Sequence, residues 1–313
     1  IGKNLCFFFE QVGEARTSLK RIEHFLLMEE RSVPINTERE SNFTVVLNRA
    51  SFKWNSSDTK MALKNISISI NKEDLCVVSG PTGCGKSALL QAILGELSID
   101  DPASMTRLPD MAYACQKAWI MSGTVKSNIV WGACFDFDKN WYDEVVASCC
   151  LDKDLNQLPD RDLTEIGEKG VNLSGGQRAR IGLARAVYAR KRFLLLDDVL
   201  AACDAKVAHT IFHNCVLKLL KDNCVILVTH NKTYESYANI CVEMKDGTVS
   251  RCFRNEKPLQ VDPAELSIDK NDKVMAEKAN DEDEAVLHVL VPEEERVKGK
   301  IGKGTFLKYL RSA

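Results

Sequence analysis

The feature that most constrains this chain is a glycine-rich segment between an apolar strand and a helix. Residues 80–87 read Gly-Pro-Thr-Gly-Cys-Gly-Lys-Ser, which fits the pattern G-x-x-x-x-G-K-[ST]. The run at 75–79 predicts a buried strand, and 87–97 predicts a helix. A tight turn between the two brings backbone N–H groups and the positive end of a helix together, and this combination binds phosphate groups. The segment therefore predicts a phosphate-binding loop in an α/β fold.

The side chains of this loop have separate expected roles. Lys86 is expected to place its charge on the outer phosphates of a nucleotide, and the hydroxyl of Ser87 is expected to bind Mg²⁺. Cys84 is assigned no catalytic role, because the reactivity of a thiol does not follow from sequence. The predicted nucleotide contacts from this segment are Gly80, Thr82, Gly83, Cys84, Gly85, Lys86, Ser87 and Ala88.

A second apolar strand ends in two acidic residues. The sequence Arg192-Phe-Leu-Leu-Leu-Asp197-Asp198 would place a carboxylate at the carboxyl-terminal edge of a parallel sheet, beside the phosphate-binding loop. We predict that Asp197 is a second ligand of Mg²⁺. Taken alone, such an acidic pair is equally typical of a helix cap. The phosphate-binding loop favours the metal role.

Composition and charge exclude several other classes. The 313 residues are 45% hydrophobic and 27% charged, which is typical of a folded globular chain of about two compact units, or one large domain with tails. Lys and Arg total 42 against 44 Asp and Glu, so no overall basic field favours nucleic acid as a partner. The twelve cysteines form no C-x-x-C pair, and the five histidines are scattered. Reduced, mostly buried thiols in the cytosol are expected.

Hydrophobic periodicity places these motifs in an α/β layout. Residues 12–26 predict one amphipathic helix, and strand patterns begin at Phe43. The apolar runs at 193–196 and 225–228 predict further buried strands of a mainly parallel sheet. Asp246-Gly247 predicts the turn of a closing hairpin between residues 240 and 253.

The pentapeptide Leu-Ser-Gly-Gly-Gln at 173–177 opens a predicted helix shortly before the acidic strand. It resembles the signature of ATP-binding-cassette (ABC) proteins, whose other elements match in order. The resemblance implies that Trp54 stacks on adenine, that Gln116 reaches the metal and the reaction centre, that 201–204 is the D-loop, and that His230 is the switch histidine. Each of these three residues also has a structural alternative. Trp54 could be a half-buried strand tryptophan, Gln116 could cap a loop, and His230 could be a hydrogen-bonded histidine of the core. The signature residues expected to contact ATP are Ser174, Gly175, Gly176 and Gln177.

Two longer stretches narrow the resemblance. Residues 115–129 and 164–177 closely resemble the first nucleotide-binding domain of multidrug-resistance-associated transporters, subfamily C of the ABC family. The matching elements extend from about residue 43 to 253. The conductance regulator of the same subfamily is the nearest relative with which this chain could be confused, but its first cassette lacks the histidine found here at His230.

The resemblance divides the chain into four parts. Residues 1–42 would be an amphipathic helix and linker from a first transmembrane domain, and 43–254 the nucleotide-binding domain, with a mainly parallel core sheet, an antiparallel β subdomain and a helical subdomain that carries the signature. Residues 255–295 would be an acidic flexible linker, and 296–313 a basic amphipathic segment leading to a second transmembrane domain. The chain, which starts with Ile1, is expected to be cut from a longer protein at the cytoplasmic face of a membrane, expected to be the plasma membrane. Its expected partners are the transmembrane domains and second nucleotide-binding domain of the same parent.

The sequence departs from the family at one position with chemical consequences. Most hydrolysing cassettes have a general-base Glu where this chain has Asp198. A carboxylate one methylene shorter stands further from the attacking water, and a misplaced general base costs about 10²–10⁴ in rate. Val199 and Ala201 also replace the usual Pro and Ser before and within the D-loop.

These features favour one function over two others. The favoured function is a domain that binds Mg-ATP in a sandwich with a second cassette, hydrolyses it slowly, and supports export of organic anions or conjugates. The alternative is a regulatory nucleotide sensor that gates a channel or partner without turnover. A soluble cassette protein fits the flanking segments and the near-neutral charge less well.

Overall fold

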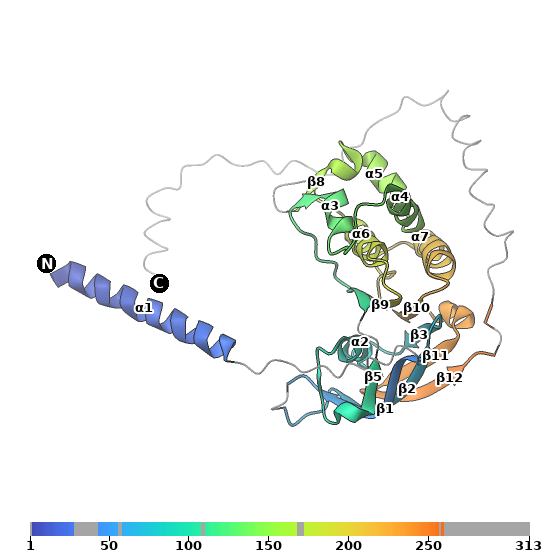
Figure 1. Cartoon of the computed structure of the whole chain (residues 1–313), viewed down its shortest axis with the longest axis horizontal. Helices are drawn as coiled ribbons and strands as arrows, with labels where there is room; N and C mark the ends of the chain where they lie inside the picture. The colour runs from blue at the N-terminus through green and yellow to red at the C-terminus, as the bar shows by residue number, and fades with distance from the viewer. Residues whose placement is uncertain are drawn as a thin grey trace, which may run out of the picture. The chain divides into compact units, whose positions relative to one another are not determined.

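The computed structural model describes residues 2–27, 43–55, 58–107, 110–167, 172–256 and 258–259 (Figure 1). The predicted acidic linker at 255–295 lies outside these residues apart from its first few positions, and the segment 296–313 lies wholly outside them. The division of the chain into four parts therefore stays a prediction.

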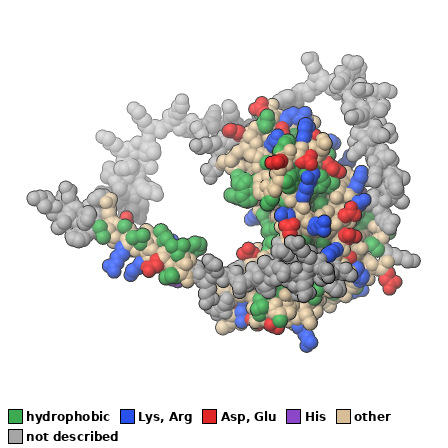
Figure 2. Space-filling model, in the orientation of Figure 1, with side chains coloured by type: hydrophobic (Ala, Val, Ile, Leu, Met, Phe, Trp, Pro, Cys, Tyr) green, Lys and Arg blue, Asp and Glu red, His purple; other side chains and the backbone are tan. Residues whose placement is uncertain are grey.

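The N-terminal helix α1 runs from Gly2 to Leu26 and confirms the helix predicted at 12–26, with additional turns before it. In the part of α1 after residue 10, Figure 2 shows apolar side chains along one side and charged ones along the other. The apolar members include Leu19 and Phe25, which are 65% and 72% exposed. None of the helices in the described part of the chain combines the length and apolar character that crossing a lipid bilayer requires.

A six-stranded sheet forms the centre of the following domain. Its strand order is β12-β11-β3-β10-β9-β6, and all neighbours are parallel except the β11–β12 hairpin, as the sequence predicted. The hairpin turns at Asp246 and Gly247, both with positive φ. The strands are β3 (Leu75–Ser79), β6 (Met111–Ala114), β9 (Phe193–Asp197), β10 (Cys224–Val228), β11 (Ile240–Lys245) and β12 (Thr248–Arg254).

A second, antiparallel sheet lies beside the first. Its central strand β1 pairs with β2 along most of its length, and with β4 and β5 on its other edge. A separate two-stranded pair, β7 with β8, lies in the helical part of the domain. The strands are β1 (Phe43–Lys53), β2 (Leu63–Asn71), β4 (Ser98–Ile99), β5 (Met105–Arg107), β7 (Gly123–Thr124) and β8 (Glu165–Ile166).

Helices cover both faces of the central sheet. They are α2 (Lys86–Leu94), α3 (Val125–Val130), α4 (Lys139–Ser148), α5 (Asp152–Gln157), α6 (Gly175–Tyr188) and α7 (Ala205–Ile211), which continues into a π-helical segment at Phe212–Leu219. Short 3-10 turns span Pro102–Ser104, Arg161–Leu163 and Lys232–Tyr237.

Two hydrophobic cores form because successive strand residues point to opposite faces of the sheet. In β9, Leu194 and Leu196 belong to the core shared with α6 and α7, whereas Phe193 and Leu195 belong to the core shared with α2 and the antiparallel sheet. All five residues of β9 are buried. A sheet covered on both faces explains the continuously apolar runs in the sequence.

The register of the central strands aligns their carboxyl ends. Val228 of β10 pairs with Asp197 of β9 on one side and with Val78 of β3 on the other. The residues that follow these strands therefore leave the sheet at one edge. Parallel α/β sheets bind their ligands at this edge.

Candidate nucleotide-binding site

The loop between β3 and α2 requires glycine at several positions, because a side chain there would be strained or would clash with neighbouring strands. Gly80, Gly83 and Gly85 have φ angles of 145°, 81° and 107°, in the region that favours glycine. A Cβ on Gly80 would overlap the backbone carbonyl of Met244, and one on Gly85 would lie 3.1 Å from a methyl carbon of Leu63. The loop is therefore packed closely against β11 and β2. Gly85 also caps α2, so the helix begins where the loop ends.

The side chain of Lys86 is held in this loop by backbone carbonyl groups of the loop. Its Nζ donates to the carbonyl oxygens of Gly80 and Pro81, each at 2.9 Å, and the residue is only 7% exposed. Thr82 and Gly83 form the exposed top of the loop. The ammonium group thus lies inside the turn that the sequence predicts to surround phosphates.

Two of the three predicted magnesium ligands, Ser87 and Asp197, are in direct contact, whereas the third, Gln116, donates its amide N–H to Asp198. The hydroxyl of Ser87 donates to Oδ1 of Asp197 at 3.0 Å, although the two residues are 110 positions apart. Two hard oxygen donors beside a phosphate-binding loop fit Mg²⁺, which takes few protein ligands and completes its shell with phosphate and water. Within the described residues, no group of three or more His, Cys, Asp or Glu side chains is arranged to hold a metal ion. A Mg²⁺ ion bound by Ser87 and Asp197 would complete its shell with phosphate and water.

Tyr113 is a member of this site that the sequence analysis missed. Its hydroxyl donates to Oδ2 of Asp197 at 3.2 Å. Burial and the charge of Asp197 raise the pKa of Tyr113 well above its ordinary value of 10.0, so it stays a hydrogen-bond donor. Each oxygen of the Asp197 carboxylate accordingly has its own donor. The position of Tyr113, three residues before Gln116 in the sequence, is a signal by which it could have been found.

The three predicted catalytic residues lie together, with Gln116 and His230 both directed at the carboxylate of Asp198. Gln116 Nε2 donates to Oδ2 of Asp198 at 3.2 Å, and His230 Nε2 lies 3.8 Å from the same oxygen. Asp198 has a φ of 51° and its backbone N–H donates to the carbonyl of Val228 at 3.1 Å. The backbone of β10 thus fixes Asp198, while His230 remains 48% exposed at the rim. The catalytic roles of these residues stay predictions.

The environment of Asp198 favours its protonated form. Burial raises the pKa of the carboxyl group above its ordinary value, and the nearby charge of Asp197 adds to the rise. His230, the Gln116 hydrogen bond and Lys86 act in the opposite direction but do not cancel it. A raised pKa places the carboxyl closer to the range in which a general base works at neutral pH.

Trp54 follows β1 and is 50% exposed. The preceding part of β1 pairs Phe52 with Leu63, whose side chain is the one that lies closest to Gly85 of the loop. Trp54 is therefore two residues from a strand position next to the phosphate-binding loop, with half of its surface open to solvent. Stacking on adenine is compatible with this location and stays a prediction.

The signature segment forms the N-terminus of α6. The side-chain oxygen of Ser174 accepts from the Gln177 N–H at 3.2 Å, and Gln177 Oε1 accepts from the Ser174 N–H at 2.9 Å. This is a capping box. Ser174 and Gly175 are exposed, so the positive end of a 14-residue helix faces solvent. The ATP contacts of Ser174, Gly175, Gly176 and Gln177 stay predictions.

Helix α6 is also fixed to the segment that follows Gln116. Arg185 donates to the carbonyl oxygens of Asn128 and Trp119 at 2.7 and 2.8 Å, and to the Asn128 side chain at 2.9 Å. A Cβ on Gly182 would lie 2.6 Å from that of Ala118, so helix and loop are in close contact. Helix α6 and this segment are therefore joined by both hydrogen bonds and close packing.

Comparison with known proteins identifies the family to which this site belongs. The family model described as "ABC transporter" matches residues 63–201, a span that includes the loop, Gln116, the signature and Asp197. The chain is 40% identical over 240 residues to human "ATP-binding cassette sub-family C member 4", with 76% of this chain and 18% of the relative covered. The chain contains an ABC-type nucleotide-binding domain of subfamily C.

Other relatives agree with this assignment. The chain is 37% identical over 257 residues to "Probable multidrug resistance-associated protein lethal(2)03659" of Drosophila melanogaster, with 76% of the chain and 18% of the relative covered. It is 32% identical over 333 residues to "ABC transporter C family member 6" of Arabidopsis thaliana, with 96% and 22% covered. The chain thus spans about a fifth of the length of these relatives. Domains of this family generally bind ATP with Mg²⁺ and hydrolyse it.

Proposed function

We propose that this ABC domain is one half of an asymmetric ATP-dependent exporter, and that it binds Mg-ATP tightly but hydrolyses it slowly. The observation that carries the proposal is the convergence of Ser87, Asp197 and Asp198 at the edge of the sheet where Lys86 lies inside the glycine turn. The matching family model is described as "ABC transporter", and the Arabidopsis relative is named an ABC transporter, which supports a role in transport. Organic anions or conjugates are the proposed cargo.

Each residue of the site has a separate role in binding the nucleotide. Lys86 neutralises the outer phosphates, and the loop N–H groups bind the phosphate oxygens. Ser87 and Asp197 would hold Mg²⁺, which when bound neutralises phosphate charge and orients the terminal phosphate for attack. Tyr113 keeps Asp197 in the position that the Ser87 hydroxyl also requires.

Slow hydrolysis follows from the reach of Asp198. Its carboxylate accepts a hydrogen bond from Gln116, its backbone N–H is bound to β10, and its side chain is one methylene shorter than a Glu at the same position. The oxygen that would accept a proton from water therefore stands further from the phosphate. The signature of the same chain is expected to face ATP bound by a second cassette, so that each composite site uses parts of both domains. Closure of that sandwich would move the transmembrane domains, and hydrolysis would reopen it.

A nucleotide sensor without turnover is the alternative. His230 favours the exporter, because it lies 3.8 Å from Asp198 where it can stabilise charge during hydrolysis, a placement that a sensor does not need.

The proposed function is tested first by ATP binding. Titration calorimetry with Mg-ATP compares the wild-type chain with Lys86→Ala and with Lys139→Ala, which removes a lysine whose side chain is 75% exposed on α4. We expect Lys86→Ala to weaken binding by at least about tenfold, as loss of a charged hydrogen bond does, and Lys139→Ala to leave it unchanged. Equal affinity for wild type and Lys86→Ala would contradict the proposal.

A further inference from the structure

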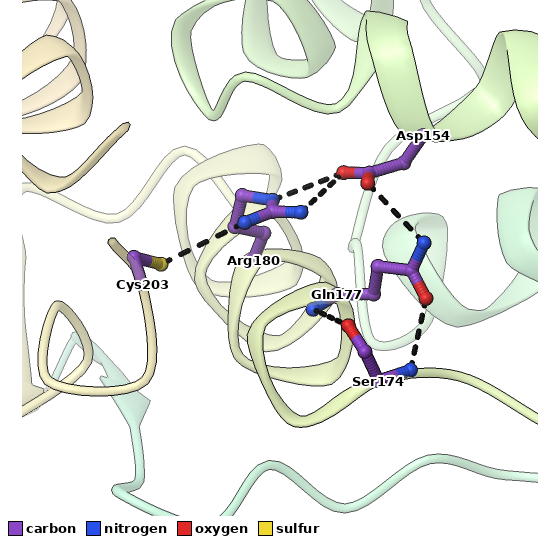
Figure 3. A network of polar contacts seen from close by, with 5 residues as sticks. All are labelled: Asp154, Ser174, Gln177, Arg180 and Cys203. Atoms are coloured by element: carbon purple, nitrogen blue, oxygen red, sulfur yellow. Dashed lines mark hydrogen bonds and ion pairs between the residues drawn. The ribbon is translucent and has the colours of Figure 1, made fainter. Parts of the chain in front are cut away.

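The N-terminus of α6 is joined to α5 by a polar network that no sequence motif indicates (Figure 3). Arg180 donates from Nε and from a terminal nitrogen to Oδ2 of Asp154, at 3.0 and 2.7 Å. The other oxygen of Asp154 accepts from Gln177 Nε2 at 3.2 Å. The side chains of Arg180 and Asp154 are only 12% and 15% exposed. Asp154 therefore holds two residues of α6 at once, in a largely water-excluded position.

This network determines which signature atoms remain available to a ligand. Both polar atoms of the Gln177 amide are engaged, one with the Ser174 N–H and the other with Asp154. The Ser174 hydroxyl accepts from the Gln177 N–H, so its own hydrogen can still be donated to an anion. Asp154 thus acts on the signature through Gln177, by fixing the side chain that closes the cap.

The same network reaches the D-loop. A second terminal nitrogen of Arg180 lies 3.8 Å from Sγ of Cys203, in hydrogen-bond range for sulfur. A Cβ on Gly176 would lie 3.0 Å from the backbone oxygen of Ala202, so the first turn of α6 also touches the D-loop directly. Figure 3 shows Arg180 between Asp154 on one side and Cys203 on the other. Arg180 therefore contacts Cys203 of the D-loop directly and is linked to the signature residue Gln177 through Asp154.

We propose that Asp154 and Arg180 are positioning residues that fix the signature turn and the D-loop of this chain as one unit. The proposal rests on the proposed function, in which the signature completes a site on the nucleotide of a second cassette. Loss of the negative charge leaves Arg180 without its ion-pair partner, and in Asp154→Asn a single acceptor oxygen replaces the two that now serve Arg180 and Gln177. The nucleotide held by this chain's own loop is unaffected, because Asp154 and Arg180 contact neither the loop nor Asp197 in any of these interactions.

The test uses Asp154→Asn, which keeps the shape of the side chain but removes the charge that Arg180 requires. In the full-length transporter, the variant is expected to lower kcat for ATP by roughly 10-fold to 10²-fold with KM changed by less than about twofold, since misplacement of a positioned group by about 1 Å has effects of this size. In the chain studied alone, ATP affinity is expected to equal that of the wild type. Rates are divided by the amount of nucleotide-binding protein, so that loss of folded material does not count as loss of kcat.

Two matched variants complete the experiment. Asp143→Asn removes the same charge from an exposed ion pair on α4 and is expected to leave kcat unchanged. Asp154→Glu keeps the charge and is expected to retain more activity than Asp154→Asn. Wild-type kcat in Asp154→Asn, with ATP bound normally, would overturn the proposal and leave the proposed function intact. Failure of the wild-type chain to bind ATP would overturn both.

Discussion

Replacement of Asp198 by Glu should increase ATP turnover. The carboxylate of Asp198 lies 3.2 Å from Gln116 and 3.8 Å from His230, and the residue is 8% exposed. One added methylene moves the carboxyl group outward by about 1.5 Å, toward the space where water must approach the terminal phosphate. A well-placed general base contributes about 10²–10⁴ in rate, so we expect at least a 10²-fold gain, equivalent to about 2.7 kcal/mol of barrier.

The assay is release of labelled phosphate from γ-labelled ATP at saturating nucleotide, measured over a range of chain concentrations. The concentration series is needed because two copies of the chain could complete each other's sites through their signatures. The double variant Lys86→Ala/Asp198→Glu controls for contaminating hydrolases, and Asp143→Glu controls for an added methylene on an exposed acid. If Asp198→Glu binds ATP as the wild type does and turns over no faster at any concentration, the explanation of slow hydrolysis is wrong.

Three further results are expected. Ser87→Ala should leave ATP binding without metal unchanged but remove most of the gain in affinity that Mg²⁺ gives, which titration with and without Mg²⁺ would detect. Gly80→Ala should lower the free energy of unfolding by about 2 kcal/mol more than Gly83→Ala, because both have positive φ but only Gly80 is crowded by neighbouring atoms, as denaturant titration can measure. Asp198→Asn should raise the melting temperature at pH 7 relative to the wild type. The raised pKa of Asp198 means that its contribution to stability is full below the ordinary value of 3.8 and is lost as pH rises through the folded-state pKa, so the difference should vanish at low pH.

Much of the nucleotide-binding edge could be predicted because its residues lie in continuous motifs. The strand at 75–79 and the helix after it were confirmed, with the helix beginning one residue earlier and ending three residues earlier than predicted. Ser87 and Asp197, two of the three residues predicted to bind Mg²⁺, lie in contact at the predicted sheet edge, and their binding of the metal stays a prediction. These predictions succeeded because a strand, a glycine turn and a helix fix local geometry, and because parallel strands must end at one edge.

The contacts that the sequence could not reveal join residues with no motif between them. Asp154 lies in a six-residue helix whose composition would fit any exposed helix, and only the packing of α5 beside α6 brings it to Gln177 and Arg180. Tyr113 belongs to no motif, and its contact with Asp197 depends on the pairing of β6 with β9. Helix α1 begins ten residues before its predicted start, because the apolar run near its N-terminus carries no helical periodicity.

We propose that this chain holds Mg-ATP and leaves it largely intact. The most direct measurement is the identity of the nucleotide retained by the purified wild-type chain after incubation with radiolabelled ATP and Mg²⁺, separated from free nucleotide and resolved by chromatography. We expect the retained label to be ATP, and we expect Lys86→Ala to retain none. Rapid conversion of the bound label to ADP by the wild type would show that Asp198 is a competent base and would contradict the account.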